Sequence, residues 1–405
     1  MRASLIFVCF AITVSVGCAQ SVTNSATDTV IRFLEQRVKN DPDDFIAAGK
    51  LGRTYLQKAR ETGLIDCYAK AEDVFRAALK WTPDSYALRA SIGSVLVAQH
   101  KFHEAAAMAG KLTTAYPQAA SAYGVLGDAL LEIGDVRGAA AAYAKLLDLG
   151  SGLSAYARLA RLDWSRGDVS GAISNLSLSL TFSNSPPESL AWAHVQKGEL
   201  LFRTGHPTDA GREYSAALQS FHGYYLGLDH IAELRAMQGQ FDEAIKSFEQ
   251  LNQRTGRPEY LQAVGDIYMA ARKPAQAKPF YDRALSVYLR ETDAGNSHYF
   301  HHLAGFYSDV RYDGVEAEKW ARRDLEVRQN AYAWDALAWA LYWKKDYAAA
   351  AVTMKKALAS GTRDAQQLGH AGSIFVRAGQ IQEGRELMMQ AAQVNPHFQD
   401  FHVHR

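Results

Sequence analysis

The 405-residue sequence has few cysteines, no excess of charge of either sign and, beyond its first twenty residues, no long apolar run. A membrane-spanning helix needs roughly 20 mostly apolar residues in a row, and this part of the chain offers no such stretch. Lys and Arg total 44 against 43 for Asp and Glu, a formal net charge of +1. The basic surface typical of nucleic-acid-binding proteins is therefore not expected, and we predict no nucleic-acid partner.

The cysteines exclude a disulfide framework. Cys9 and Cys18 lie in the first twenty residues, which leaves Cys67 as the one thiol in the rest of the chain. A single thiol forms no internal disulfide, so the fold must be held together by packing.

The first nineteen residues have the pattern of an export signal: Arg2 precedes an apolar run over 3–16, and small residues follow it. We interpret residues 1–19 as a secretory signal peptide that is cleaved after Ala19. The alternative is acylation of Cys18, because Val16-Gly17-Cys18 resembles the cleavage box of bacterial lipoproteins, although Ser15 replaces its usual large aliphatic residue. We predict an exported protein, periplasmic or extracellular, whose membrane contact is limited to a lipid on Cys18.

What the sequence does contain is an internal repeat. A small residue, followed four positions later by a large one in the clearest cases and by alanine in two weaker ones, recurs ten times, spaced 33 to 40 residues apart and most often 34. A second small residue, such as Gly52, precedes each pair at a matching phase. Apolar residues at helical spacing with this period predict stacked pairs of antiparallel helices. The clearest pairs are Ala71/Phe75, Ala139/Tyr143, Ala210/Tyr214, Ala244/Phe248 and Ala277/Tyr281.

These residues resemble the tetratricopeptide repeat (TPR) family, whose pattern is W-x2-L-G-x2-Y, then A-x3-F, then P. Leu51-Gly52-x2-Tyr55 and Val264-Gly265-x2-Tyr268 match its first half, and Pro83, Pro117 and Pro396 occupy its closing position. The resemblance implies an all-α fold, an α-α superhelix (TPR solenoid) of about ten helix-turn-helix repeats. It implies interaction in general and does not name the partner.

The repeat phase sets the expected boundaries. A spacer and leading helix occupy residues 20–43, the array residues 44–397, and a C-terminal tail residues 398–405. Breaker-rich loops are expected at 184–187 and 292–296, where the repeat spacing lengthens. Each unit of such an array contacts its neighbours alone, so truncation of the end repeats should melt the array gradually. Glycine turns between paired helices are expected at Gly134, Gly167, Gly205, Gly239 and Gly379.

In TPR proteins one phase of the first helix of each repeat faces the concave surface. Here that phase combines aromatic, apolar and acidic residues, and the segment 332–343 (YAWDALAWALYW) is the densest aromatic patch. A groove of this kind suits an extended peptide or a partner helix with apolar anchors and some basic character. For each residue alone, the alternative is a solvated helix face or, for the aromatics, core packing. We predict that the partner-binding groove includes Asp128, Arg161, Trp164, Trp192, Glu199, Phe202, Gln262, Asp266, His301, Asp335, Trp339 and Tyr342.

His298, His301 and His302 form the best metal candidate, because positions i, i+3 and i+4 share one face of a helix. Their sequence neighbours are aromatic and not acidic. We interpret the three as a polar cluster on a first helix and predict no metal and no cofactor.

Motifs for catalysis are also missing: we find no nucleophile elbow, phosphate loop, paired-cysteine motif or metalloprotease helix in a convincing context. A solenoid of packed hairpins is, moreover, expected to lack a deep, dry pocket. The sequence therefore predicts a non-enzymatic scaffold that binds a protein or peptide. The alternatives are a self-assembling structural protein of the cell envelope and a metal-dependent enzyme that uses the histidine cluster.

Overall fold

The computed structural model describes residues 26–401 and 403, and this part of the chain is α-helical apart from turns and loops. The predicted signal peptide, Cys18 and the start of the spacer lie outside the described residues. The helices are α1 (Ala26–Asn40), α2 (Phe45–Thr62), α3 (Asp66–Trp81), α4 (Tyr86–Ala98), α5 (Phe102–Ala115), α6 (Ala120–Glu132), α7 (Val136–Leu149), α8 (Leu153–Ser165), α9 (Val169–Leu180), α10 (Pro187–Arg203), α11 (Pro207–Ser220), α12 (Tyr225–Met237), α13 (Phe241–Thr255), α14 (Pro258–Ala270), α15 (Pro274–Asp293), the 3-10 turn η2 (Ser297–Tyr299), α16 (Phe300–Gly305), the π-helical turn η3 (Phe306–Val310), α17 (Gly314–Val327), α18 (Ala331–Trp343), α19 (Tyr347–Leu358), α20 (Ala365–Arg377) and α21 (Ile381–Val394).

After the leading helix α1, the helices from α2 to α21 pair in order into ten antiparallel hairpins. The predicted solenoid of about ten repeats is confirmed. Helix α1 buries Ile31 and Leu34 in the same apolar cluster as the first hairpin. In the part of the chain that the structure covers, no helix combines the length and the apolar character needed to cross a membrane. Cys67, on α3, is buried, and burial raises the pKa of its thiol.

In several hairpins a glycine of the first helix packs directly on a large side chain of the second helix. A Cβ added to Gly127 would lie 2.3 Å from the ring of Tyr143, and one added to Gly198 would lie 2.4 Å from Tyr214. Both tyrosine rings are fully buried. The aromatic residue of each of these pairs thus packs on the glycine of its own repeat, where no larger residue fits.

The turns inside the hairpins use a left-handed residue as predicted. Gly134, Gly167, Gly205, Gly239 and Gly379 all have φ between 77° and 89°. In three further hairpins the same position is held by His100, Arg272 and Lys345, with φ from 59° to 68°. The turn geometry is therefore kept even where the glycine signal is absent from the sequence.

The two longer repeat spacings have different origins. Residues 181–186 form the expected loop between α9 and α10. The second expected loop, 292–296, is shorter than predicted, since α15 continues through Asp293. The hydroxyl of Thr292 donates to the carbonyls of Tyr288 and Leu289, which keeps this polar side chain satisfied inside the helix.

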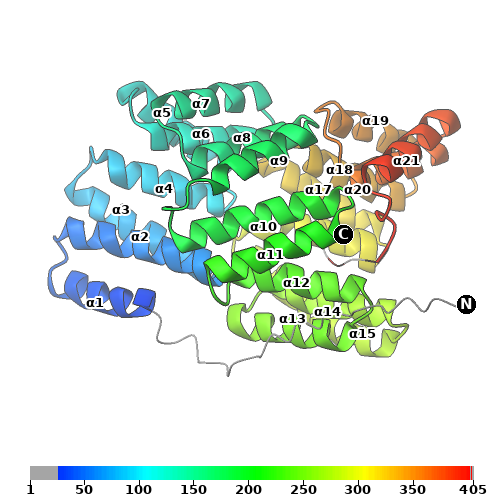
Figure 1. The fold of residues 1–405 in the computed structure, drawn as a ribbon, viewed down its shortest axis with the longest axis horizontal. Coiled ribbons are helices and arrows are strands. Elements are labelled where there is room, and N and C mark those ends of the chain that lie inside the picture. The colour runs from blue at the N-terminus through cyan, green and yellow to red at the C-terminus, as the bar shows by residue number, and fades with distance from the viewer. Residues whose placement is uncertain (1–25, 402, 404–405) are drawn as a thin grey trace, which may run out of the picture.

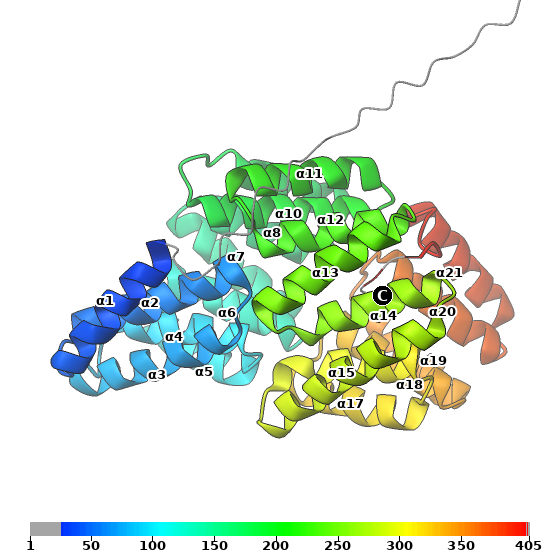
Figure 2. The ribbon, with the colours of Figure 1, turned by 90° about the horizontal axis from the view of Figure 1, so that it is seen from below.

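The hairpins form a succession of stacked layers that runs from left to right in Figure 1 and winds back on itself. Figures 1 and 2 show α2–α5 at one end, α10–α13 across the middle and α17–α21 at the other end. Residues far apart in sequence meet where successive turns touch, and we call this contact surface the seam. Side chains of Ser297, Asn330, Thr362 and Asn395 donate across it to Gln99, Glu132, Ser165 and Phe202, with separations of 193 to 198 residues in sequence.

The near-constant separation shows that the seam is regular. A separation of 193 to 198 residues corresponds to a little under six repeats of about 34 residues. The C-terminal end of the first helix of one repeat therefore contacts the start of the sixth repeat after it. At Glu132 the contact includes the backbone, because the N–H of Gln329 donates to the Glu132 carbonyl at 2.9 Å.

The segment after α21, which includes the start of the predicted tail, continues this pattern of contacts toward earlier repeats. It runs back from α21 toward the middle of the molecule (Figure 2). Phe398 packs close to Gly369, the ring of Phe401 meets that of Phe241 edge-on at 6.3 Å, and Val403 is fully buried. The segment occupies the place that an eleventh repeat would take at the seam.

Candidate functional site

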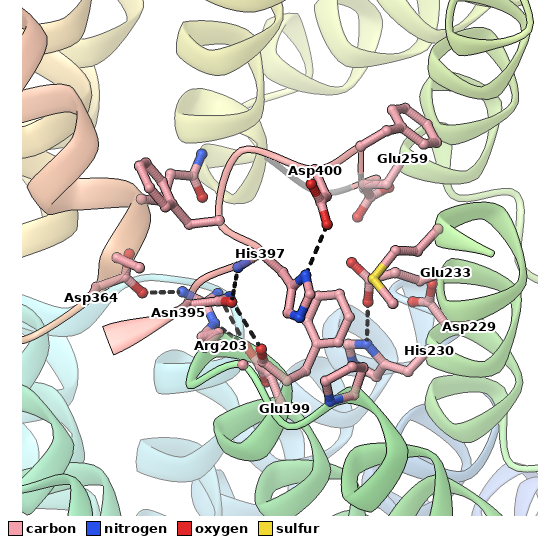
Figure 3. Close-up of a pocket in the computed structure, with 18 of the residues that line it drawn as sticks. Glu199, Arg203, Asp229, His230, Glu233, Glu259, Asp364, Asn395, His397 and Asp400 are labelled. Carbon is pink, nitrogen blue, oxygen red and sulfur yellow. Dashed lines mark hydrogen bonds and ion pairs between the residues drawn. The ribbon is translucent and has the colours of Figure 1, made fainter. Parts of the chain in front are cut away.

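The winding encloses a cavity of about 270 Å³ between α10, α12, α14, α20 and the segment 395–401. The sequence predicted no deep pocket, because hairpins stacked in an open array do not enclose one. The cavity exists because the chain returns on itself at the seam. Figure 3 shows carboxylates arranged around the hollow, with the imidazole of His397 projecting into it from the C-terminal segment.

The cavity wall is strongly acidic. Six carboxylates and the two guanidiniums of Arg203 and Arg257 line it, which is an excess of four negative charges when the imidazoles are neutral. The carboxylates deep in the wall are less than a tenth exposed, whereas His397 and Asp400 are more than half exposed and mark the mouth. The six acidic residues are Glu199, Asp229, Glu233, Glu259, Asp364 and Asp400.

Local structure explains why these carboxylates stand where they do. Asp364 caps α20 by accepting from the N–H of Gln367 at 3.0 Å. Glu259 lies in the first turn of α14, where the helix dipole favours a negative charge. Asp229 and Glu233 are four residues apart on α12 and so share one face.

Several of the wall charges are paired. Arg203 lies 2.9 Å from Asp364 and 3.1 Å from Glu199, so it joins α10 to α20 across the seam. Arg257 lies 2.6 Å from Glu259. Both pairs neutralise part of the negative charge of the wall.

Two pKa shifts follow from this crowding. Burial alone would lower the pKa of His230, but its hydrogen bond to Glu233, at 2.9 Å, and the charges of Glu233 and Asp229 raise it. Burial opposes the ionisation of Glu259, yet the charge of Arg257 outweighs it and lowers the pKa of Glu259 to about 2. At neutral pH the floor of the cavity therefore keeps ionised carboxylate.

The structure brings two of the predicted groove residues to the cavity, Glu199 and Phe202. The other predicted groove residues are not among those that line the cavity. Asp128 accepts from the hydroxyl of Tyr143 at 2.9 Å, and Asp266 accepts from Tyr281 at 2.7 Å. The same pairing in two repeats shows that these carboxylates hold the tyrosine of their own hairpin.

Most remaining predicted residues contact other parts of the chain. Trp164 donates to the hydroxyl of Tyr332 across the seam at 2.7 Å, and Arg161 pairs with Glu132. Trp192 packs against two apolar clusters, and Gln262 accepts from the hydroxyl of Tyr288 at 3.0 Å.

The aromatic patch on α18 forms a stack. Trp339 lies between Tyr342, at 4.7 Å, and His370, at 4.1 Å, and its indole N–H donates to Asp309 at 2.8 Å. His370 Nδ1 in turn lies 3.2 Å from both carboxylate oxygens of Asp335. The structure thus brings Asp335, Trp339 and Tyr342 together around the imidazole of His370, a residue that the sequence analysis did not single out.

The histidine cluster lies at the seam beside the cavity. His301 and His298 are joined there by His100 from the turn between α4 and α5, with ring centroids 5.8 Å and 4.5 Å from the His100 ring. Burial and the charge of His302 lower the pKa of His298 to about 3, so this imidazole is neutral at neutral pH. The acidic neighbour that the local sequence lacks is supplied by Glu259 of the preceding repeat, 3.6 Å from His302.

Sequence reasoning missed most of the cavity wall. Asp229, Glu259, Asp364 and Asp400 come from α12, α14, the start of α20 and the last segment. Two of them carried a local signal: Asp364 as a helix cap and Glu259 beside Pro258 at a helix start. Their convergence depends on the winding of the superhelix, which no repeat encodes alone.

Comparison with known proteins gives one match to a family model: residues 90–154 match the tetratricopeptide repeat. Among curated proteins, none is matched by this sequence. Among solved structures, the chain is similar to human IFIT1 in its dimer with PPP-AAAA, with 14% identity and a TM-score of 0.48, over 91% of this chain and 95% of that one. It is also similar to a tetratricopeptide repeat protein from Parabacteroides merdae, with 16% identity and a TM-score of 0.39, over 64% and 93% of the two chains. For yeast Tom70 the identity is 12% and the TM-score 0.37, over 86% and 92%.

The matched residues span α5, α6 and α7 with most of α4 and the start of α8, and further helical hairpins continue on both sides. The spacing, the packing of a small residue on a large one and the family match agree. The chain has the fold of a tetratricopeptide repeat solenoid, and its residues 90–154 match the family model.

Proposed function

We propose that the chain is a non-enzymatic scaffold that binds a protein or peptide partner by taking a Lys or Arg side chain of that partner into the acidic inner cavity. The observation that carries the proposal is the excess of carboxylates over guanidiniums in the cavity wall. A cation transferred into such a site gains from several fixed carboxylates at once, in a region partly shielded from water.

The size and shape of the cavity agree with a side chain as the occupant. About 270 Å³ is slightly below the range of roughly 300–1,000 Å³ usual for small-molecule sites. Phe202, Met237 and Phe398 add apolar surface to the wall, which suits the methylene stem of a Lys or Arg side chain. The rest of the partner would lie over the mouth at His397 and Asp400.

As the place of action we propose the cell envelope or the secreted space. The support is the export pattern over residues 1–19. Lipid attachment at Cys18 and release after Ala19 remain the two alternatives, and mass spectrometry of the protein from its native source distinguishes them by the mass of the N-terminal peptide.

The binding proposal is tested with labelled short peptides that carry a central Arg, compared with the same peptides carrying Gln. We expect the Arg peptides to bind, with an affinity that falls as salt is added, because exposed charges at the mouth are screened. The double variant Glu199→Gln/Asp400→Asn should weaken binding five- to thirtyfold, or about 1–2 kcal/mol. Fluorescence anisotropy measures both.

A matched control removes two exposed carboxylates outside the cavity, Asp242→Asn/Glu243→Gln on α13, and should leave binding unchanged. A second control, His402→Ala/His404→Ala/Arg405→Ala, removes the basic side chains that follow the cavity segment. Tighter peptide binding to this variant would show that the chain's own residues compete for the site. Equal binding of Arg and Gln peptides, or no effect of the cavity variant, would refute the proposal.

A further inference from the structure

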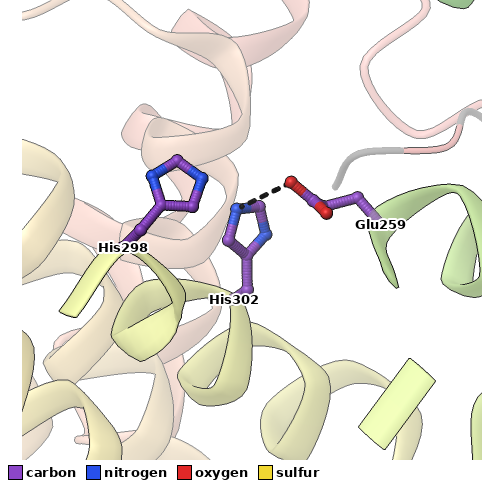
Figure 4. Close-up of side chains that lie close together, drawn as sticks. All are labelled: Glu259, His298 and His302. Atoms are coloured by element: carbon purple, nitrogen blue, oxygen red, sulfur yellow. Dashed lines mark ion pairs between the residues drawn. The ribbon is translucent and has the colours of Figure 1, made fainter. Parts of the chain in front are cut away.

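Three side chains with metal-binding atoms converge at the seam, next to the cavity. Glu259 comes from the first turn of α14, and His298 and His302 from η2 and α16 of the next hairpin. Their ligand atoms all lie within 4.8 Å of one another. Figure 4 shows His302 between the other two, with the three side chains directed toward a common region.

Two of these side chains end in buried atoms that have no hydrogen-bond partner. They are Oε2 of Glu259 and Nε2 of His298. Buried polar atoms in folded proteins are bonded in the great majority of cases, so two that face one region need a physical explanation. Glu259 is only 6% exposed, which leaves bulk water little access to its carboxylate.

The surroundings orient these atoms as acceptors. His298 Nδ1 lies 3.2 Å from Nε2 of His100, which belongs to the turn between α4 and α5 on the other side of the seam. When His298 donates through Nδ1, the lone pair of its Nε2 is directed away from His100. Oε1 of Glu259 likewise accepts from Arg257 at 2.6 Å, so Oε2 is the carboxylate oxygen that is available to a metal ion. Metal-binding histidines and carboxylates are typically held by such outer partners.

The dimensions allow one small cation. The centre of a triangle with 4.8 Å sides lies about 2.8 Å from each corner, and zinc bonds to nitrogen or carboxylate oxygen are about 2.0–2.2 Å long. Side-chain rotations that move each ligand atom by less than about 1 Å are therefore enough to close the site.

We propose that Glu259, His298 and His302 bind one divalent transition-metal ion of the zinc class at the seam. Two imidazoles and one carboxylate are a donor set that suits zinc and its first-row neighbours and leaves a coordination position open. Since Glu259 and His302 also line the cavity, an open coordination position of the ion would be reached from the cavity. The ion ties α14 to α16 directly and, through His100, ties the two turns of the superhelix together.

The test uses the full chain without an affinity tag, after treatment with a chelator. Cobalt(II) is titrated first, because its visible absorption reports nitrogen and oxygen ligation, and zinc(II) affinity is then measured by competition with a chromophoric chelator. We expect one ion per chain. Glu259→Gln and His298→Ala/His302→Ala should weaken binding at least a hundredfold, whereas His100→Phe should weaken it ten- to a hundredfold through the lost outer partner.

Two controls locate the ion. His103→Ala/His222→Ala removes the same number of imidazoles from exposed positions, and His402→Ala/His404→Ala removes the pair near the last described residues; both should bind as the wild type does. Circular dichroism of each metal-free variant checks that it folds. A wild-type chain with no saturable cobalt or zinc binding overturns the proposal whatever the variants do, and so does equal binding by wild type and a folded Glu259→Gln variant. The measurement uses no peptide, so its outcome is independent of the proposed scaffold function.

Discussion

At the scale of single residues, the array depends on glycines that touch an aromatic ring. In Gly198→Ala the added methyl would lie 2.4 Å from the buried ring of Tyr214. Overpacking of this kind costs about 1–3 kcal/mol, so we expect the free energy of unfolding to fall by that amount in urea titrations. Gly110→Ala is the matched control: this glycine is also inside a helix, α5, but has open space around it. There the better helix propensity of alanine should raise stability by roughly 0.5–1 kcal/mol.

A second residue-scale feature is the ion pair between His370 and Asp335. Burial alone would lower the pKa of His370, but the charge of Asp335 and the hydrogen bond to it, with Asp309 and Asp364, raise the pKa above its usual value. The stacked ring of Trp339 faces the imidazolium as well. The folded state thus binds a proton more tightly than the unfolded state does.

The sign of the pH effect follows from linkage. The stabilisation by this pair is complete below the unfolded pKa of about 6.5 and is lost as the pH rises through the folded value. We expect His370→Gln to destabilise the protein more at pH 6 than at pH 9 in urea unfolding. His103→Gln, at an exposed position on α5, should cost the same at both pH values. A His370 effect that does not depend on pH would show that the imidazole contributes by packing alone.

At the scale of helices and turns, the seam gives different roles to turns that look alike in sequence. Gly167 and Gly239 both have φ near 78°, but a Cβ on Gly167 would lie 2.1 Å from the carbonyl oxygen of Gly361 across the seam, while Gly239 has nothing near it. Alanine at either position costs about 1–2 kcal/mol for the left-handed backbone.

Gly167→Ala should therefore destabilise the protein by roughly 1–3 kcal/mol more than Gly239→Ala does. Thermal and urea unfolding of the two variants measure the difference directly. If the two cost the same, the contact between Gly167 and the loop before α20 contributes nothing in solution.

The local elements were largely predictable from sequence, since each has a local cause. Helical spacing of apolar residues, the small-to-large pairs and the five glycine turns gave the number and order of the hairpins. Three turns kept their shape with His100, Arg272 and Lys345, where no glycine marks them. The length of α15 was missed, because Thr292 satisfies its hydroxyl within the helix while its sequence neighbours suggest a loop.

At the scale of the whole molecule, prediction from sequence reached the solenoid but not its closure. The cavity and the histidine cluster both depend on residues that meet about 195 positions apart, and this distance follows from small rotations between repeats, summed over six of them. The sequence of a single repeat does not determine this summed rotation. Glu259 was not associated with His298 and His302 for a different reason: their contact depends on how two neighbouring hairpins pack, which the helical spacing within one helix does not describe.

Closure also changes the expected unfolding. In a nearest-neighbour array, removal of the last hairpin would leave α8 untouched, but here Thr362 donates to the carbonyl of Ser165 at the end of α8. We expect a chain lacking residues 361–405 to lose amide protection in α8 and α10, by about five- to thirtyfold in exchange rate, while α2 and α3 keep theirs. Hydrogen exchange with mass spectrometry reports each helix separately. Unchanged amide protection in α8 would instead agree with the gradual, end-to-end melting expected of a repeat array.

The inward course of residues 395–403 has a consequence for how the protein is made. Synthesis proceeds from the N-terminus, and early hairpins can fold while later ones are still being added. Phe398 and Phe401, however, reach the ribosome exit after all ten hairpins, and they complete the wall around the acidic cavity. During synthesis the inner carboxylates of α10, α12 and α14 are thus open to solvent and to chaperones, and the binding cavity is the last part of the molecule to form.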